Sequence, residues 1–554
     1  MGSTTTRLIG KQNRRGPLAV VSPTFSLVFS LGLGLAGARP VEAGETIRIA
    51  IGTQDTTINC ATGGLIIREL KLLEKYLPHD DAYGGKYKDV SYDISWKNFT
   101  AGAPLTSEMV AHKLDFGAMA DFPSVLNGVA FKKQGERSLY LGPLSASATG
   151  AGNGLLVPSN SPVQSLAELK GKQISVPFGS ASHGMLLRAI DSLGWNPETD
   201  VVITSQAPEV GGSFLKSGKI DAHADFVPFA ELFPFRGFAR KILDGSTVGV
   251  PTSHGLLVTG AFADKYPELV VAFVKAALEA DRLVTAEPEK YSELIQKVTG
   301  VEAEVNYMFH GPLGIQTRDY TIKPSVRKGI EVAVDTLKLL KKTDTTLDLS
   351  TWIDDRFVRQ AARELGLDYE ARLKSDAPLP LKGPDARTGE PIREPKLAGQ
   401  IWVAGEARVR AYATPRSTLA ALAELERTGK KVRVAFVHDR ESGLKLFAHK
   451  AFYVQGGTEE GTERRPTDAR PDGAGGKTKI ETRGETDGVR AAFLSRARAE
   501  AWAKAHGQGR VLEAARALAA GGGANPKAAT GTAASAAGGE PTGAAPAVPP
   551  TAAR

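Results

Sequence analysis

The sequence predicts an α/β protein of two lobes joined by a two-strand hinge, followed by a small α+β domain. The composition supports a globular protein, since 42% of the 554 residues are hydrophobic and 23% are charged. Short β-rich runs alternate with helical stretches in two successive series. Two similar segments, NGLLV at 153–157 and HGLLV at 254–258, bracket the second series. We expect these segments to carry the chain from one lobe to the other and back.

The first lobe is predicted over residues 44–150, where strands and helices alternate. Residues 90–96 (VSYDISW) alternate between polar and apolar side chains, as a strand with one buried face does. Short connections between such units favour a parallel sheet with helices on both faces. The expected strands are residues 46–51, 90–96 and 116–119, and the expected helices are residues 62–77, 105–114 and 122–131.

The second lobe is predicted over residues 151–255, and the chain then returns to the first lobe for residues 256–370. The strands expected in the second lobe are residues 155–157, 174–177, 201–204 and 221–225, and its helices are residues 183–193 and 210–216. The helices expected after the return are residues 267–285, 288–298 and 324–340. The two crossings would form a hinge, for which we nominate Asn153, Gly154, His254 and Gly255.

The first 43 residues have the pattern of a secretory signal. A basic start that includes Arg14 and Arg15 precedes a largely apolar stretch over residues 20–36, and Val41-Glu42-Ala43 fits cleavage between small residues. The apolar stretch is short and interrupted, so we expect an exported, soluble chain that begins at Gly44, with an uncleaved anchor as the alternative. Removal of the signal takes five basic residues and one acidic residue and leaves a net charge of +4. Such a mild charge gives no support for nucleic-acid binding.

The rest of the chain divides by composition. Residues 371–400 contain five prolines and are predicted to be a linker, residues 401–520 a small α+β module, and residues 521–554 a disordered tail rich in Ala, Gly and Pro. Cys60 is the only cysteine, which excludes an intramolecular disulfide and a cysteine-based metal cluster.

Three phrases carry a family resemblance: KLDFGAMADFP at 113–123, SPVQSLAELKGK at 161–172 and GKIDA at 218–222. Together with the export signal and the two lobes, they resemble the NitT/TauT-type solute-binding proteins of ABC importers, which serve nitrate, sulfonates and taurine. The resemblance covers residues 45–365. It implies a type II periplasmic-binding fold, a small solute trapped between closing lobes in the periplasm, and delivery to a membrane permease driven by a separate ATPase. The chain itself has no G-x-x-x-x-G-K-[ST] phosphate-binding loop.

The module at 401–520 resembles the NosL-like proteins, a copper-handling family, through KAFYV at 450–454 and the segment at 491–507. Cu(I) prefers Met and Cys ligands, and the chain has neither after Met308. His438, His449 and His506 remain either imidazole ligands or packing residues.

Candidate ligand-binding residues follow the predicted strands or open the helices after them. In open α/β sheets, ligands bind beyond the carboxyl ends of the strands, where helix N-termini offer free N–H groups. The candidates are Gln54, Asp55, Thr56, Asn98, Phe99, Thr100, Asp121, Phe122, Ser180, Ser182, His183, Glu209, Val210, Asp225 and Phe226.

Four of these candidates are acidic, and ionised carboxylates repel a nitrate or a sulfonate. The ligand is therefore an anion held by amides, a zwitterion, a cation, or a metal species held by Asp121, His183 and His223. Structural roles compete with these: Ser180 and Asp121 can cap the helices they open, and His223 can pack as a neutral side chain on its strand.

The leading prediction is a solute-binding component of an importer, without catalysis and without a cofactor. A periplasmic metal-binding or metal-delivery protein is the first alternative. A thiamine-pyrimidine-synthase-like enzyme of the same fold is a remote one, because that chemistry needs a cysteine-rich segment that this chain lacks. Ser180, Ser182 and His183 are too close in sequence to form a nucleophile, a base and an orienting group with good geometry.

Overall fold

The computed structural model describes residues 44–79, 81–339, 346–375, 378–456, 488–507 and 509–521. The predicted export signal, the polar stretch at 457–487 and most of the predicted tail lie outside the described residues. Among the described residues, no helix is both long enough and apolar enough to cross a membrane.

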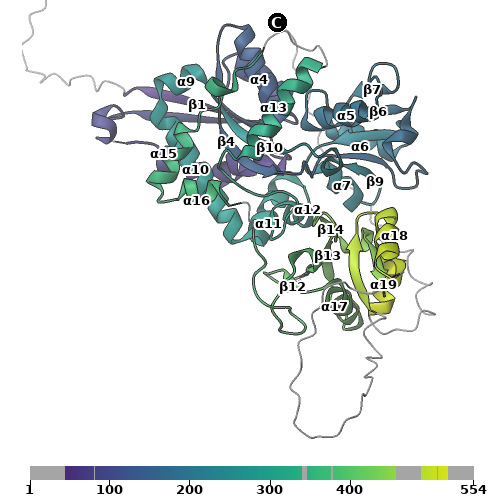
Figure 1. Cartoon of the computed structure of the whole chain (residues 1–554). Helices are drawn as coiled ribbons and strands as arrows, with labels where there is room; N and C mark the ends of the chain where they lie inside the picture. The colour runs from purple at the N-terminus through teal and green to yellow at the C-terminus, as the bar shows by residue number, and fades with distance from the viewer. Residues whose placement is uncertain are drawn as a thin grey trace, which may run out of the picture. The chain divides into compact units, whose positions relative to one another are not determined.

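The first sheet has five strands in the order β2-β1-β3-β10-β4. Figure 1 labels β1, β10 and β4 of this sheet. Its parallel part is β2, β1 and β3, and β10 runs antiparallel between β3 and β4. The parallel part follows from the predicted alternation, whereas β10 comes from a segment more than a hundred residues further along the chain. The strands are β1 Thr46–Thr53, β2 Ser91–Asn98, β3 Phe116–Ala120, β4 Ser138–Ser147 and β10 Thr252–Thr259.

Helices cover both faces of this sheet, because its strands bury side chains on both sides. Tyr140 and Leu257 point into one core, and Leu141 and Leu256 point into the other. The first core is closed by α3 Gly102–Val110, α4 Asp121–Lys133 and α13 Pro324–Leu339. The second is closed by η1 Ile58–Gly63, α1 Leu65–Glu69, α2 Leu72–Tyr76, α10 Pro267–Ala286 and α15 Arg356–Glu364.

The single helix expected at 62–77 is wrong, since this stretch forms the end of η1 and two short helices, α1 and α2. The apolar spacing of a helix is present, but the chain turns at Gly64 and again at Lys71, whose φ of 52° is left-handed. Helical spacing alone does not reveal such breaks.

The second sheet repeats the arrangement of the first, in the order β7-β6-β8-β5-β9. Strands β7, β6 and β8 are parallel, and β5 runs antiparallel between β8 and β9. The strands are β5 Gly154–Pro158, β6 Gln173–Val176, β7 Val202–Ser205, β8 Ala222–Asp225 and β9 Ala239–Asp244. The helices that pack on it include α5 Ala181–Ser192, α6 Pro208–Lys216 and α7 Phe229–Phe235.

The chain crosses between the two sheets twice, at residues 148–153 and at residues 245–251, which include α8 Gly245–Val248. The crossings touch, since the Gly245 N–H donates to the Asn153 carbonyl at 2.8 Å. A methyl group on Gly150, whose φ is 86°, would lie 2.2 Å from the Val250 carbonyl oxygen. The second crossing therefore lies earlier than predicted: His254 and Gly255 are inside β10, paired with β3. Asn153 and Gly154 lie at the end of the first crossing and the start of β5.

After β10 the chain returns to the first lobe. This part contains α9 Gly260–Lys265, α11 Pro288–Thr299, α12 Ala303–His310, α14 Leu349–Trp352 and α16 Tyr369–Leu373, besides α10, α13 and α15. Helix α10 is a long amphipathic helix begun by Pro267, and its apolar face packs on η1, α2 and α15.

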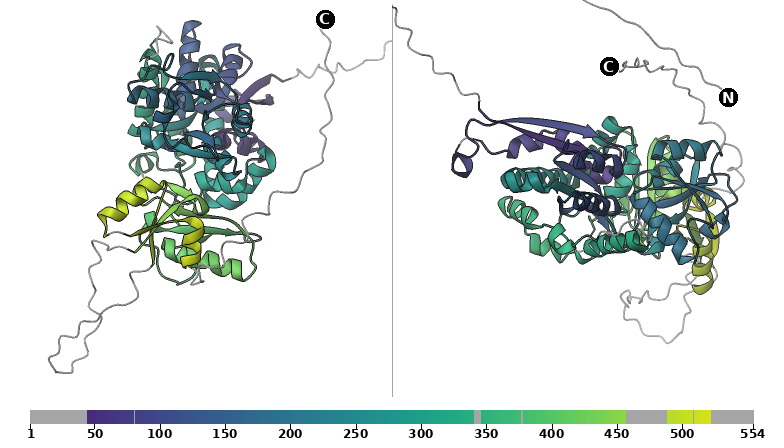
Figure 2. Two further views of the ribbon diagram at one scale, coloured as in Figure 1. Left: turned by 90° about the vertical axis from the view of Figure 1, so that its right-hand side faces the viewer. Right: turned by 90° about the horizontal axis from the view of Figure 1, so that it is seen from above.

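The C-terminal module forms two small antiparallel sheets, in the orders β12-β11-β13-β14 and β16-β15-β17. In Figure 2 the module is the green to yellow part of the ribbon. Its strands are β11 Gly399–Val403, β12 Arg410–Tyr412, β13 Val432–His438, β14 Lys445–Phe447, β15 Phe452–Gln455, β16 Val489–Phe493 and β17 Arg510–Glu513. Its helices are α17 Pro415–Arg427, α18 Arg496–Ala505 and α19 Ala514–Gly521.

The module packs on α12 through an aromatic and charged contact. Tyr307 of α12 lies 5.4 Å from Trp402, measured between ring centroids, and Arg433 Nε donates to Glu304 Oε1 at 2.7 Å. Lys445 is fully buried, and its Nζ donates to the Pro312 carbonyl at 2.6 Å.

Candidate functional site

The predicted candidates of the first lobe lie together at the carboxyl ends of β1, β2 and β3. Asn98 Oδ1 accepts the Asp55 N–H at 2.9 Å, and the Phe99 N–H donates to the Thr53 carbonyl at 2.8 Å. Gln54 is buried and donates to the Ala118 carbonyl at 2.8 Å. These bonds join the three strand ends into one surface, as the parallel sheet requires.

The candidates of the second lobe include the first turn of α5. Ser180 Oγ accepts the His183 N–H at 3.2 Å and lies 2.9 Å from Ser182 Oγ. The His183 ring stacks on Phe178 with centroids 4.8 Å apart, and its Nδ1 accepts the Gly179 N–H at 3.1 Å. The capping role expected of Ser180 is therefore confirmed, whereas its role in ligand binding stays a prediction.

The first turns of α4 and α5 meet across the two lobes. The Phe122 ring lies edge-on to His183, with centroids 6.3 Å apart. A methyl group on Gly184 would come within 3.2 Å of Phe122. Two helix N-termini, one from each lobe, thus lie next to each other, and helix N-termini are the natural partners of anionic groups.

A cavity of about 40 Å³ lies beside this contact, between α4, α5, α13 and the two crossings. One water molecule needs roughly 10 to 15 Å³ of cavity, so in this structure there is room for a few waters only. Among the described residues that line the cavity, Arg188 is the one arginine or lysine, and its guanidinium donates to Thr336 Oγ1 at 2.7 Å and to the Val332 carbonyl at 3.0 Å. Asn153 Oδ1 is buried there without a hydrogen-bond partner, and the Thr252 hydroxyl lies beside the Asp121 carboxyl.

Asp121 lies at the edge of this cavity and is 6% exposed. It is the first residue of α4, where its carboxylate accepts the Phe122 N–H at 2.6 Å and the Ser253 N–H at 2.9 Å. Burial raises the pKa of Asp121 to about 6 despite these bonds, so the carboxyl changes charge just below neutral pH.

The other acidic candidates are compensated or exposed, which corrects the charge argument made from the sequence. Asp55 pairs with Arg68 of α1 at 3.0 Å, and Asp225 accepts from His223 Nε2 at 2.9 Å. Glu209 is exposed. The acidic residues therefore do not form a negative cluster that faces a ligand.

His223 does not have the surroundings of a metal ligand. Its Nδ1 lies 2.7 Å from Ser175 Oγ and its Nε2 bonds to Asp225, so both ring nitrogens have partners in a fully buried site. Within the part of the chain that the structure describes, no three His, Cys, Asp or Glu side chains are grouped to hold a metal ion.

The aromatic candidates are divided between separate cores. Phe99 and Phe122 belong to the core between the first sheet and α3, α4 and α13, whereas Phe226 packs against Phe229 at 5.7 Å in the second lobe. Thr100 and Val210 are exposed, and Thr56 is half-buried. These residues do not surround a common space in this structure.

Three polar residues form a hydrogen-bonded group beside the first crossing, which the sequence alone does not indicate. The Asn59 amide nitrogen lies 3.0 Å from His254 Nδ1 and donates to Gln316 Oε1 at 2.6 Å, and Gln316 Nε2 donates to the Ala151 carbonyl at 2.8 Å. Burial lowers the pKa of His254 to about 3, so its ring is neutral and Nδ1 can accept. Asn59 lies just past the segment we nominated after β1, and Gln316 belongs to no strand or helix.

Each of the two five-stranded sheets has one antiparallel strand beside its third parallel strand, and the chain crosses between the sheets twice. This arrangement defines a two-lobed periplasmic-binding fold of the second type. The fold class predicted from the sequence is thus confirmed. Known proteins of this architecture bind solutes between lobes that close about the hinge.

Comparison with known proteins agrees. Residues 142–291 match the model of the family described as NMT1/THI5 like. A protein of Escherichia coli (strain K12) provisionally named as an aliphatic sulfonates-binding protein is 28% identical over 280 residues, which are 50% of this chain and 78% of that protein. The taurine-binding periplasmic protein of the same bacterium is 27% identical over 288 residues, 49% of this chain and 86% of that protein.

Among solved structures, the periplasmic aliphatic sulphonate binding protein SsuA from Escherichia coli is 25% identical, with a TM-score of 0.44 over 56% of this chain and 97% of that chain. The relatives confirm the predicted resemblance to sulfonate- and taurine-type binding proteins. The family match ends at residue 291, so the NosL-like resemblance of the C-terminal module stays a prediction.

Proposed function

We propose that this chain is the solute-binding component of an ABC importer, which captures a small anionic solute of the sulfonate or taurine type between its lobes. The observation that carries the proposal is the meeting of the α4 and α5 N-termini across two lobes that the crossings at 148–153 and 245–251 join. Rotation about these crossings would open and close the space between the two helix ends. The names of the sequence relatives support the choice of solute.

An anionic head group fits the electrostatics of this region. The buried acids of the strand ends have partners within their own lobes, and the first turns of α4 and α5 carry the partial positive charge of a helix N-terminus. Asp121 is the exception, because its carboxyl titrates near pH 6. We therefore expect the solute to bind more tightly below pH 6, where Asp121 is protonated, than at pH 8.

A binding role without turnover is part of the proposal. Cys60 is 2% exposed, and burial raises the pKa of its thiol far above the ordinary range, so it does not supply a thiolate. Ser180 Oγ caps α5, and His183 Nδ1 accepts a backbone N–H rather than donating to a carboxylate. This arrangement does not support the enzyme alternative, and the surroundings of His223 do not support the metal alternative.

The proposed setting is the periplasm, with a membrane permease and a separate ATPase as partners. The periplasmic relatives and the export pattern of residues 1–43 support this setting. The permease would contact the two lobes in their closed arrangement, as the resemblance to importer components implies.

The test is ligand-dependent stabilisation of the mature chain without product formation. We expect taurine or ethanesulfonate to raise the melting temperature in proportion to the logarithm of its concentration. Phe122→Ala should weaken this effect, because it removes the contact between α4 and α5. Lys133→Ala, at the exposed far end of α4, is the matched control and should leave it unchanged. Stabilisation by none of the sulfonates, or steady conversion of one, would contradict the proposal.

A further inference from the structure

A second cavity, of about 260 Å³, lies in the first lobe away from the α4–α5 contact. It is bounded by the end of α10, the end of α12, the segment 314–318, α16 and residues 378–380. Its size far exceeds the roughly 10 to 15 Å³ that one water molecule needs. The lining mixes apolar residues with polar ones, and the ionisable side chains among them are Asp281, His310, Arg318 and Arg372.

Arg318 is the central feature of this cavity. The residue is 7% exposed, and its Nη1 donates to Thr62 Oγ1 at 3.2 Å. Its Nε and Nη2 groups are buried and have no hydrogen-bond partner. A buried guanidinium with unused donors is costly, and protein structures normally satisfy such groups. Burial lowers the pKa of Arg318 to about 10, so it stays charged at neutral pH.

The neighbouring charges leave Arg318 without a full counter-charge. Asp319 is already engaged by Arg372 at 3.1 Å and by Lys323 at 3.5 Å. Asp281 faces the cavity from α10, and its Oδ1 is buried without a partner. Counting these five side chains, three positive charges meet two negative ones when Asp281 is ionised.

His310 lines the cavity with a neutral polar side chain. It is 4% exposed, and burial lowers the pKa of its ring well below the ordinary value, with the charge of Arg318 acting in the same direction. Its ring nitrogens make no hydrogen bond within normal geometry. One oxyanion would supply acceptors for the free donors of Arg318, and a neutral imidazole can donate to it as well.

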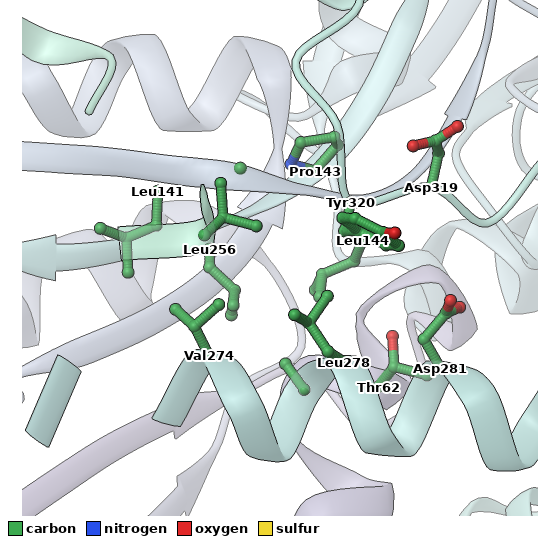
Figure 3. Close-up of a pocket in the computed structure, with 13 residues that line it drawn as sticks. Thr62, Leu141, Pro143, Leu144, Leu256, Val274, Leu278, Asp281, Asp319 and Tyr320 are labelled. Atoms are coloured by element: carbon green, nitrogen blue, oxygen red, sulfur yellow. The ribbon is translucent and has the colours of Figure 1, made fainter. Parts of the chain in front are cut away.

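The apolar cavity shown in Figure 3 adjoins this space and shares Asp281 with it. Figure 3 shows Asp281, Asp319 and Thr62 at one end of that cavity and Leu141, Leu256 and Val274 towards the other. Its volume is only about 20 Å³, which holds about one water molecule. A guest of the larger cavity therefore does not extend a hydrocarbon tail under the sheet.

We propose that the Arg318 cavity is a second binding site, which takes a small oxyanion or a compact organic anion with a carboxylate, sulfonate or phosphate group. The guanidinium of Arg318 binds the anionic oxygens, and Thr285, His310 and Gln316 are among the residues that surround the rest. This site is separate from the proposed solute site, because none of its lining residues belongs to α4, α5 or the crossings.

Asp281 makes the site sensitive to pH. Burial raises the pKa of Asp281 to about 6, and Arg318 and Arg372 act against this rise while Asp319 adds to it. Below pH 6 the protonated Asp281 no longer competes with an anion for Arg318, whereas His310 stays neutral because burial holds its pKa well below the ordinary value. Anion binding should therefore strengthen as the pH falls from 7.5 to 5.5, and Asp281→Asn should bind as tightly at pH 7.5 as the unchanged protein does at pH 5.5.

The experiment measures sulfate binding to the mature full chain by calorimetry and by melting temperature, against sodium chloride at equal ionic strength. Arg318→Gln should weaken binding roughly ten- to hundredfold, the effect of losing a charge-assisted hydrogen bond. Because this variant also loses the bond to Thr62, Thr285→Phe serves as a second variant, which fills the cavity and leaves Arg318 intact. It should abolish sulfate binding and keep the response to taurine.

Phe122→Ala distinguishes the two sites in the opposite direction. It should leave sulfate binding unchanged while it weakens the response to taurine. If sulfate binding survives in Thr285→Phe, or is lost in Phe122→Ala, the sulfate sits between the lobes and the proposal is wrong. A flat calorimetric response of the unchanged protein at both pH values also overturns it, whatever the result with taurine.

Discussion

The contact between the two crossings gives the most direct test of the structure. Three glycines separate the effect of backbone conformation from that of close packing. Gly150 has a φ of 86°, and a methyl group on it would lie 2.2 Å from the Val250 carbonyl oxygen. Gly245 lies outside the left-handed region, but a methyl group there would lie 2.1 Å from the Gly150 carbonyl oxygen. Gly135 has a φ of 75° and nothing within 4 Å of an added methyl group.

The expected costs follow from these geometries. A left-handed φ costs an alanine roughly 1 to 2 kcal/mol, and overpacking against backbone costs roughly 1 to 3 kcal/mol. The lower entropy of the unfolded chain returns roughly 0.4 to 1 kcal/mol in each case. From the midpoints of these ranges we expect Gly135→Ala to lose about 0.8 kcal/mol, Gly245→Ala about 1.3 kcal/mol and Gly150→Ala about 2.8 kcal/mol.

The assay is urea unfolding followed by tryptophan fluorescence, with the midpoint and slope compared among the three variants. The order of the urea midpoints shows whether the two crossings are in contact. If Gly150→Ala and Gly245→Ala are no less stable than Gly135→Ala, the crossings are not in contact and the hinge described above is wrong. If Gly150→Ala and Gly135→Ala lose the same stability and Gly245→Ala loses none, backbone conformation matters and close packing does not.

Two further predictions concern buried charges. Arg68→Gln leaves Asp55, which is 8% exposed, without its ion pair, and should lower the free energy of unfolding by about 1 to 2 kcal/mol after allowance for the partial exposure of Arg68. In a double-mutant cycle, adding Asp55→Asn should recover part of this loss. If the effects of the two substitutions simply add, the ion pair contributes nothing to stability. Burial lowers the pKa of Lys445 well below its ordinary 10.5, so the unfolded chain binds this proton more tightly and stability should rise with pH up to about 10.5. Lys445→Met should flatten that rise in urea titrations at several pH values, whereas an unchanged slope would show that Lys445 is charged in the folded state.

Much of the fold is predictable because it rests on local patterns. The parallel strands of both sheets and helices α4, α5, α10 and α11 follow from apolar spacing and from proline or serine at helix starts. The antiparallel strand of each sheet is harder, because its pairing depends on residues far along the chain. The repeated NGLLV and HGLLV segments do mark these strands, β5 and β10, but they lie beside the crossings rather than on them.

The charges of the candidate site could not be predicted from the sequence. The strand ends could be nominated, and Asp55 and Asn98 indeed meet there, but their charges could not be judged without their partners. The charge of Asp55 is compensated by Arg68, which lies thirteen residues further along the chain and beyond η1. The charge of Asp225 is compensated by His223, two residues earlier on the same strand. Charge counted along the sequence therefore suggested an acidic cleft that the folded chain does not have.

The surroundings of Arg318 could not be predicted from the sequence either. Nothing in its neighbourhood along the chain distinguishes it from any other arginine, and its free donors are evident only once α10, η1 and α12 surround it. The cost of burying an unsatisfied guanidinium is large enough that a fold would rarely keep it without a use or a guest. An anion site of this kind is found by asking which buried donors have no acceptor, a question that only the folded structure can answer.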